Sequence, residues 1–182
     1  MFQVRIHGRG GQGVVTAAEL LSVAAFLDGA HAQAFPSFGS ERTGAPVVAF
    51  CRVDDGEIRV REPIVAPDAL IVQDPTLLHQ VDVFGGLRPG GVVLLNSTRE
   101  PDELGVGDKN VLCVPATELA RTHLGRPLPN AALLGAFAAA TGVVTLPSVC
   151  AAIRERFAAK PAEGNVAAAL TAFALIGEPT HA

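Results

Sequence analysis

The chain has 182 residues and a formal net charge of −4 at pH 7, from 14 basic and 18 acidic side chains. Hydrophobic residues make up 49% of the sequence and charged residues only 18%, a composition that excludes intrinsic disorder. The acidic balance, together with the absence of Trp and Tyr, argues against binding to nucleic acid or to a membrane surface.

The first third of the chain predicts a strand, a glycine-rich turn and a helix. Residues 2–7 alternate between apolar and polar side chains, as a half-buried strand does, and residues 14–27 have apolar side chains at helical spacing. A second strand at 30–35 and a loop from Pro36 to Pro46 follow. Residues 47–53 and 57–60 flank Asp54-Asp55-Gly56, which predicts a β-hairpin.

The rest of the chain alternates short apolar strands with helices. Strands are expected at 69–72, 92–95 and 111–114, and helices at 76–83, 115–124, 131–141, 147–159 and 163–176. This alternation predicts a single α/β domain over residues 1–182, a three-layer Rossmann-like fold with an Ala-rich helical C-terminal part. Its sheet is expected to be mostly parallel, and the hairpin at 47–60 makes it mixed.

The sharpest motif is a run of glycines between the first strand and the first helix. Its residues are Gly8, Arg9, Gly10, Gly11, Gln12 and Gly13, which fit the pattern G-x-G-x-x-G. Glycines let backbone N–H groups approach an anion, which the positive end of the following helix also favours. A dinucleotide site would need a carboxylate ~20 residues beyond the glycines, but residues 33–37 contain none. The motif indicates either an anion or cofactor contact, or a turn that needs glycine for steric reasons alone.

The loop after the second strand is the next candidate. Its residues for a substrate or interface role are Phe38, Ser40, Glu41, Arg42 and Thr43. Because the loop follows a strand parallel to the first, we expect it at the carboxyl edge of the sheet beside the glycine turn. Arg42 could hold a carboxylate or phosphate with two hydrogen bonds. The alternative is a solvated Glu41–Arg42 pair with the loop's aromatic residues capping the core.

Other residues do not assemble into a catalytic set. Asp74 and Asn96 end expected parallel strands, where ligands bind in such folds, but helix capping explains them equally well. The five histidines and three cysteines show no spacing typical of a metal site or a catalytic triad. We therefore predict no metal site and no catalytic residue in this chain. The odd cysteine count and the lack of an apolar targeting segment predict a cytoplasmic protein.

Two segments together resemble a known family. Residues 5–18 read RIHGRGGQGVVTAA, and residues 33–46 read QAFPSFGSERTGAP. They are similar to the gamma subunit of 2-oxoacid:ferredoxin oxidoreductases, most closely the pyruvate:ferredoxin type, or pyruvate synthase. The resemblance extends through Asp74-Pro75, Asn96, the segment 130–142 and the segment 160–165, and so covers essentially the whole chain.

The resemblance implies a subunit that is inactive alone, within a complex that converts a 2-oxoacid and coenzyme A to an acyl-CoA, CO₂ and reduced ferredoxin, reversibly. Thiamine diphosphate with Mg²⁺ and the [4Fe–4S] clusters are then expected on alpha and beta catalytic subunits and a ferredoxin-like delta subunit or domain. The run Gly8–Gly13 would lie on the coenzyme A side, with Asn96 and Asn130 as secondary candidates.

The implied substrate is pyruvate, and several alternatives remain. A relative acting on 2-oxoglutarate, a branched-chain 2-oxoacid or indolepyruvate would share the same motifs. A free-standing nucleotide- or coenzyme A-binding α/β module is the alternative from a different class of protein.

Overall fold

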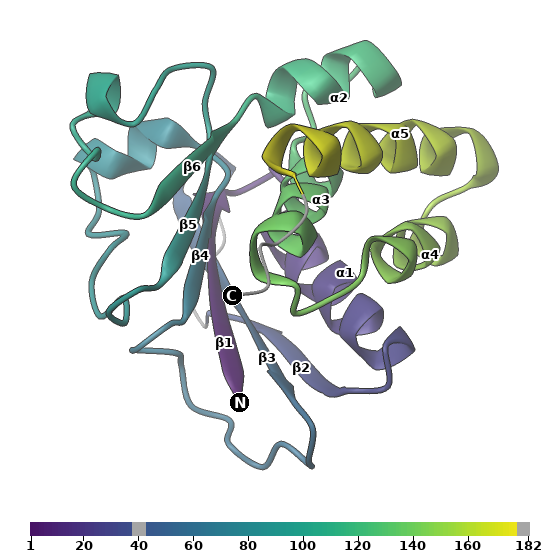
Figure 1. Ribbon diagram of the computed structural model, residues 1–182, viewed down its shortest axis with the longest axis horizontal. Coiled ribbons are helices and arrows are strands. Elements are labelled where there is room, and N and C mark those ends of the chain that lie inside the picture. Colours follow the sequence, from purple (N-terminus) through teal and green to yellow (C-terminus); the bar gives the residue numbers. More distant parts are fainter. Residues whose placement is uncertain (38–42, 178–182) are drawn as a thin grey trace.

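The computed structural model describes residues 1–37 and 43–177 and contains one six-stranded sheet (Figure 1). The strand order is β2-β3-β1-β4-β5-β6, which places β1 in the interior of the sheet. The strands are β1 (Phe2–Arg9), β2 (His31–Pro36), β3 (Pro46–Asp54), β4 (Ala69–Val72), β5 (Val92–Asn96) and β6 (Val111–Val114). These bounds confirm the α/β class and the mixed sheet.

The strand β3 makes the sheet mixed, and the predicted hairpin at 47–60 is wrong. β3 pairs antiparallel with β1 on one edge and with β2 on the other. Both hydrogen-bonding edges of β3 are therefore occupied, and residues 57–60 form no strand and are largely exposed. The residues Asp54-Asp55-Gly56 end β3, but the segment after them does not pair back along β3.

The remaining strands run parallel, so their carboxyl ends share one edge of the sheet. β1 pairs with β4, β4 with β5 and β5 with β6, all in parallel register, and β2 has the same direction as β1. The chain leaves β1 toward β2 and later proceeds from β4 toward β6 on the opposite side. The junction of β1 and β4 is thus the switch point where folds of this class bind ligands.

The five α-helices lie on one face of the sheet (Figure 1). They are α1 (Val14–Leu27), α2 (Ala116–Leu124), α3 (Asn130–Thr141), α4 (Leu146–Arg156) and α5 (Ala159–Ile176). α3 is buried all round, because α5 covers its outer side. The two helices approach so closely that a Cβ on Gly135 would overlap the carbonyl oxygen of Ala169. Only glycine fits there.

Sequence periodicity placed these helices well but misjudged the junction of the last two. The helix predicted at 147–159 ends at Arg156, and the helix predicted at 163–176 begins at Ala159, because Phe157 and Ala158 are extended and separate α4 from α5. The helix predicted at 76–83 is a short 3₁₀ helix, η1 (Pro75–His79), whose N-cap Asp74 accepts a hydrogen bond from the Thr76 N–H. A further 3₁₀ helix, η2, spans Asp102–Leu104.

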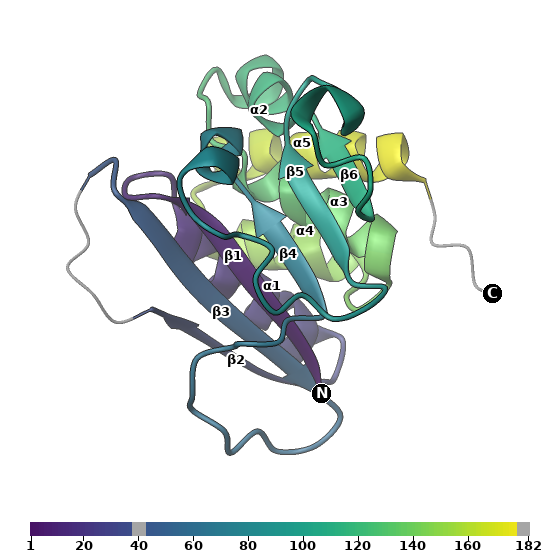
Figure 2. The same ribbon diagram turned by 90° about the vertical axis from the view of Figure 1, so that its left-hand side faces the viewer.

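The second face of the sheet is covered by η1, η2 and irregular segments, which form the third layer (Figure 2). Over β4, β5 and β6 this cover is apolar, with Leu77, Val83 and Val106 buried against the strands. Over β1 and β3 the sheet carries polar and charged side chains, including Arg5, Arg52 and His7, of which Arg52 and His7 are buried. One sheet face therefore has two kinds of cover.

Candidate functional site at the carboxyl edge of the sheet

The glycine turn joins β1 to α1 at the switch point and has clear steric requirements. Gly11 and Gly13 have positive φ angles of 90° and 74°, which side chains strongly disfavour. A Cβ on Gly8 would lie 2.5 Å from Val14 Cγ2, and one on Gly13 would lie 2.5 Å from Asn130 Nδ2. The steric explanation of the motif therefore holds at these positions, whether or not the turn also meets a ligand.

The side chains of Arg9 and Gln12 are occupied by contacts within the chain. The Arg9 Nε donates to Asp74 Oδ2 at 3.1 Å, and its Nη2 donates to Thr76 Oγ1 at 2.7 Å and to Gln80 Oε1 at 2.9 Å. Gln12 Nε2 donates to the same carboxylate oxygen at 2.9 Å, while its Oε1 accepts the Arg9 N–H at 2.7 Å. The two side chains fasten the glycine turn to η1 rather than projecting as ligand groups.

Asp74 is the anchor of this network. Partial burial acts to raise the pKa of its carboxyl, but the hydrogen bonds from Thr76 and Gln12 and the Arg9 charge outweigh burial, and the net pKa lies below the ordinary value. Asp74 therefore stays ionised at neutral pH and holds Arg9 through a charge-assisted hydrogen bond.

Asn96 and Asn130 belong to a buried chain of amides beneath the edge. Asn130 Nδ2 donates to the Gly13 carbonyl at 3.1 Å, and its Oδ1 accepts from Gln73 Nε2 at 3.0 Å. Asn96 Nδ2 donates to the Gln73 carbonyl at 2.8 Å, and its Oδ1 accepts the Thr117 N–H at the start of α2. Both predicted candidates thus have internal partners. Gln73, which sequence reasoning missed, connects them, and its only signal was its place after a buried strand.

The groups left for an anion are backbone N–H groups. Those of Gly11 and Gly13 donate no hydrogen bond to any described residue. The N-cap residue of α1 is Gly13, so the helix has no side-chain cap, and its first turn contains no acidic residue. Uncapped N–H groups at the positive end of a helix favour an anionic ligand.

The described end of the following loop lies beside the glycine turn, as the sequence predicted. The Gly10 N–H donates to the Ala45 carbonyl at 2.9 Å, and the Gly44 N–H donates back to the Gly10 carbonyl at 3.0 Å. Thr43 forms an isolated parallel bridge with Gly10. The other candidates of this loop, Phe38, Ser40, Glu41 and Arg42, lie outside the described residues.

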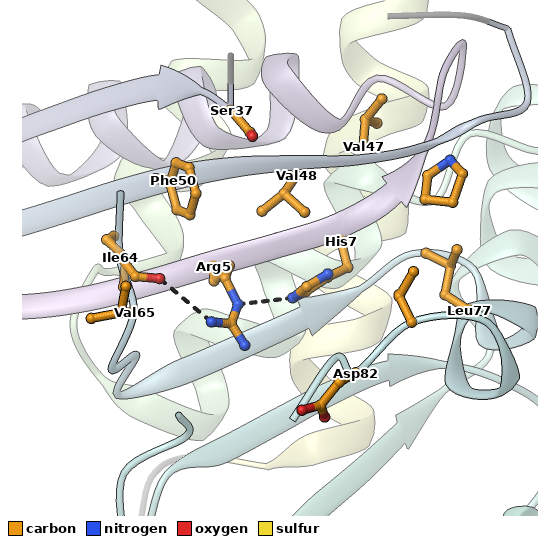
Figure 3. Close-up of a pocket in the computed structure, with 12 residues that line it drawn as sticks. Arg5, His7, Ser37, Val47, Val48, Phe50, Ile64, Val65, Leu77 and Asp82 are labelled. Carbon is orange, nitrogen blue, oxygen red and sulfur yellow. Dashed lines mark hydrogen bonds between the residues drawn. The ribbon is translucent and has the colours of Figure 1, made fainter. Parts of the chain in front are cut away.

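A pocket of about 410 Å³ opens beside this edge, on the second face of the sheet (Figure 3). Val48, Phe50 and Leu77 form apolar parts of its wall, and Ser37 and Pro46 lie where the candidate loop leaves and rejoins the sheet. Sequence reasoning did not identify this pocket, because five of its twelve lining residues come from residues 64–82, which lie far from β1 in the chain.

The floor of the pocket carries a buried, neutral histidine. His7 is 5% exposed, and its Nε2 accepts a hydrogen bond of 2.9 Å from Arg5 Nε. Burial, reinforced by the Arg5 charge and opposed by Asp82, lowers the pKa of His7 to about 4. His7 therefore carries its single proton on Nδ1 at neutral pH and can serve as a hydrogen-bond donor.

Arg5 holds the segment that covers the pocket. Its Nη1 donates to the Ile64 carbonyl at 3.4 Å, and its Nη2 donates to the carbonyls of Val83 at 2.9 Å and Gly85 at 2.7 Å. Like Arg9, it is a cross-linking residue. The polar residues of β1 stand at its odd-numbered positions. They lie on the face opposite to the helices, because side chains alternate between the two faces of a strand.

The described cysteines and acidic side chains do not gather into a metal or cluster site. Burial raises the pKa of Cys51 to about 12, so that its thiol stays protonated and is a poor ligand. In residues 1–37 and 43–177 no group of three or more His, Cys, Asp or Glu could hold a metal ion. The described side chains therefore do not fit an iron–sulfur cluster or the Mg²⁺ of a thiamine diphosphate site. Within the same ranges no helix is long and apolar enough to cross a membrane.

Comparison with known proteins gives one consistent family. The family model described as pyruvate ferredoxin/flavodoxin oxidoreductase matches residues 3–175. The chain is 52% identical over 155 residues to the pyruvate synthase subunit PorC of Methanosarcina barkeri, covering 85% of each chain. It is 49% identical over 177 residues to the pyruvate/ketoisovalerate oxidoreductases common subunit gamma of Thermococcus kodakarensis, covering 95% and 96% of the two chains.

The fold has solved counterparts. The pyruvate oxidoreductase subunit PORC of Thermotoga maritima superposes with a TM-score of 0.83 at 32% identity, covering 95% of each chain. The keto/oxoacid ferredoxin oxidoreductase gamma subunit of Geobacter sulfurreducens gives a TM-score of 0.74 at 26% identity. The arrangement of helices and strands described above is therefore shared with these subunits.

Proposed function

Because this chain belongs to the pyruvate ferredoxin/flavodoxin oxidoreductase family, we propose that it is the gamma subunit of a pyruvate:ferredoxin oxidoreductase complex. The complex converts pyruvate, coenzyme A and oxidised ferredoxin to acetyl-CoA, CO₂ and reduced ferredoxin, in either direction. The observation that carries the proposal is identity at about half of the aligned residues to pyruvate synthase subunits named PorC, over most of both chains.

We propose that the cofactors are held by other chains and that this subunit is inactive alone. The described residues offer neither a cluster of cysteines nor a group of carboxylates, which supports a division of labour with alpha, beta and delta partners. Thiamine diphosphate and the [4Fe–4S] clusters supply the decarboxylation and the electron transfer in such a complex. The cytoplasm is the proposed compartment.

The contribution proposed for this chain is an anion contact at the glycine turn. Gly11 and Gly13 offer free N–H groups at the N-terminus of α1, suited to a phosphate of coenzyme A. Arg9 and Gln12 hold the turn in place through Asp74 and act as positioning residues. Asn130 supports the turn from below.

A matched pair of variants tests this contact in the reconstituted complex. Gly11→Ala and Gly29→Ala place similar strain on glycines with φ of 90° and 86°. The new Cβ meets open space at Gly29 and only Thr43 Cγ2, at an unstrained 4.0 Å, at Gly11. We expect the coenzyme A KM to rise roughly threefold to tenfold in Gly11→Ala only. Equal KM values for coenzyme A in the two variants would show that the turn is not part of the coenzyme A site.

Reconstitution tests the assignment itself. Alpha, beta and delta subunits assembled with this chain should form acetyl-CoA from pyruvate, and omission of this chain should abolish the activity. Activity of this chain alone, or full activity without it, would contradict the proposal. A stable monomer that binds a nucleotide and no partner would favour the free-standing module instead.

A second substrate has specific support. Relatives at 47–49% identity are named as a gamma subunit common to pyruvate and ketoisovalerate oxidoreductases. We propose 2-oxoisovalerate as the alternative substrate, reached with a different set of catalytic partners. Identification of the acyl-CoA formed by the complex purified from its native cell separates acetyl-CoA from isobutyryl-CoA.

A further inference from the structure

A second cavity lies between the end of α2 and the start of α5, and its lining includes no residue of the glycine turn. Figure 1 shows these two helices on the helical side of the sheet. Its volume is about 400 Å³, within the ~300–1,000 Å³ of small-molecule sites. Leu124, Leu128 and Phe157 supply apolar wall, from α2, from the connection to α3 and from the connection between α4 and α5. The backbones of α2 and α5 come into close contact at Gly164, where a Cβ would lie 2.7 Å from the His123 carbonyl oxygen.

The lining of this cavity is basic, although the whole chain is acidic. Arg126 and Lys160 supply its positive charge, and no carboxylate lines it. Neither Arg126 nor Lys160 forms a salt bridge within the described ranges. Glu163, a carboxylate on the neighbouring turn of α5, is paired instead with Arg154 at 2.9 Å. The positive charge at the cavity is therefore uncompensated.

The start of α5 adds to this positive potential. The helix has 18 residues, begins after Ala158 without a side-chain cap and has no acidic residue in its first turn. An uncapped N-terminus presents free N–H groups and the positive end of the helix dipole. Lys160 lies in that turn, so charge and dipole favour the same kind of ligand.

An additional polar group lies deeper in the lining. Asn165 is 4% exposed, and its Nδ2 donates to the Pro161 carbonyl at 2.9 Å. This bond fixes the orientation of the amide, and Oδ1 accepts no hydrogen bond from any residue in the described part of the chain. This oxygen is therefore free to accept a hydrogen bond from a ligand that carries a donor.

We propose that this cavity binds a small organic anion with an apolar body. The acidic group lies at Lys160, Arg126 and the first turn of α5, and the apolar body contacts Leu128 and Phe157. A donor group on the ligand, where present, reaches Asn165 Oδ1. The site is separate from the glycine turn and does not depend on the proposed function.

Calorimetry with the full-length chain tests this with octanoate as the probe. One octanoate is expected to bind per chain, because it combines a carboxylate with an apolar tail. Acetate, which lacks the tail, and octylammonium, which reverses the charge, are expected not to bind. Absence of octanoate binding at millimolar concentration, or equal binding of octylammonium, would overturn the proposal.

Charge variants locate the site. The double variant Lys160→Glu and Arg126→Glu should weaken octanoate binding by at least about tenfold, since both side chains face an anion. The control Arg59→Glu and Lys109→Glu makes the same change in net charge at two residues outside the lining and should leave binding unchanged. Similar weakening of octanoate binding in both double variants would show a non-specific charge effect and would contradict the proposed site. If the reversal unfolds the chain, as circular dichroism would reveal, Lys160→Gln with Arg126→Gln gives the same comparison.

Discussion

The two faces of the sheet are covered by different physical means. On the helical face, small and aliphatic residues allow helices to pack closely, as at Gly135, where α3 meets the backbone of α5. On the opposite face over β1 and β3, arginines hold irregular segments by their backbone carbonyls, as Arg5 does at residues 64, 83 and 85. Dispersion and apolar burial stabilise the first, and charge-assisted hydrogen bonds the second. The faces should therefore respond differently to mutation and to pH.

The largest expected effect is on the helical face. Phe137 lies in the centre of α3, is fully buried and packs edge-on against Phe2 at 6.3 Å between ring centroids. Phe137→Ala should lower the free energy of unfolding by about 3–5 kcal/mol, because it removes buried area and leaves a cavity. Urea denaturation measures the change. A loss below about 1 kcal/mol would mean that the face is not close-packed.

The second effect is the pH dependence of stability that His7 contributes on the polar face. The pKa of His7 is lowered from 6.5 to about 4 in the folded chain, so the unfolded chain binds more protons between these values. Stability should therefore fall as pH decreases from 6.5 toward 4, by roughly 2–3 kcal/mol in total. Comparison of denaturation curves for the parent and His7→Gln isolates this contribution. The same slope in both proteins would assign the acid sensitivity elsewhere.

Removal of the Arg5 clamp should have a smaller and more local effect. Arg5→Met keeps much of the side-chain volume but loses the hydrogen bonds to three carbonyls and to His7. We expect a loss of about 1–3 kcal/mol. Amide hydrogen exchange should accelerate in residues 62–87 while α3 stays protected. Uniform acceleration over both faces would show that the two covers unfold together.

The smallest effect concerns a polar tie on the helical face. Asp28, after α1, accepts hydrogen bonds from the Thr145 N–H at 2.7 Å and from Ser148 Oγ at 2.6 Å at the start of α4. Partial burial opposes ionisation, but these bonds outweigh it and lower the pKa of Asp28. Asp28→Ala should cost about 1 kcal/mol at pH 7.

Denaturation at low pH tests whether these hydrogen bonds to Asp28 depend on its charge. A carboxyl with a lowered folded pKa stabilises above its unfolded pKa, and this stability is lost as pH falls through the folded value. The difference between the parent and Asp28→Ala should therefore vanish at a pH below the ordinary aspartate range. A difference that persists there would point to packing rather than charge.

Local patterns predicted the elements better than their pairing. Alternation in β1 and helical spacing in α1 are properties of neighbouring residues, and both elements form where expected. The hairpin at 47–60 failed because a turn signal does not reveal that both edges of β3 are already paired. Packing decided that outcome.

The site shows the same limit. The glycine motif predicted a tight turn at the carboxyl edge, and the turn is there. The sequence could not show that Arg9 and Gln12 would be bound by Asp74, because those contacts join residues more than sixty positions apart. The pocket above His7 likewise depends on a distant covering segment.

The bond from Asn130 to the carbonyl of Gly13 sets an order of events during synthesis. It joins residues 117 positions apart, and the tie from Asp28 to Thr145 spans the same interval. The turn near the N-terminus therefore cannot reach its final form until the chain has been made through α3 and beyond. Contacts of such long sequence separation are slow to close. The nascent chain must therefore keep β1 and α1 available for most of its translation, a period in which exposed apolar strands are prone to aggregate.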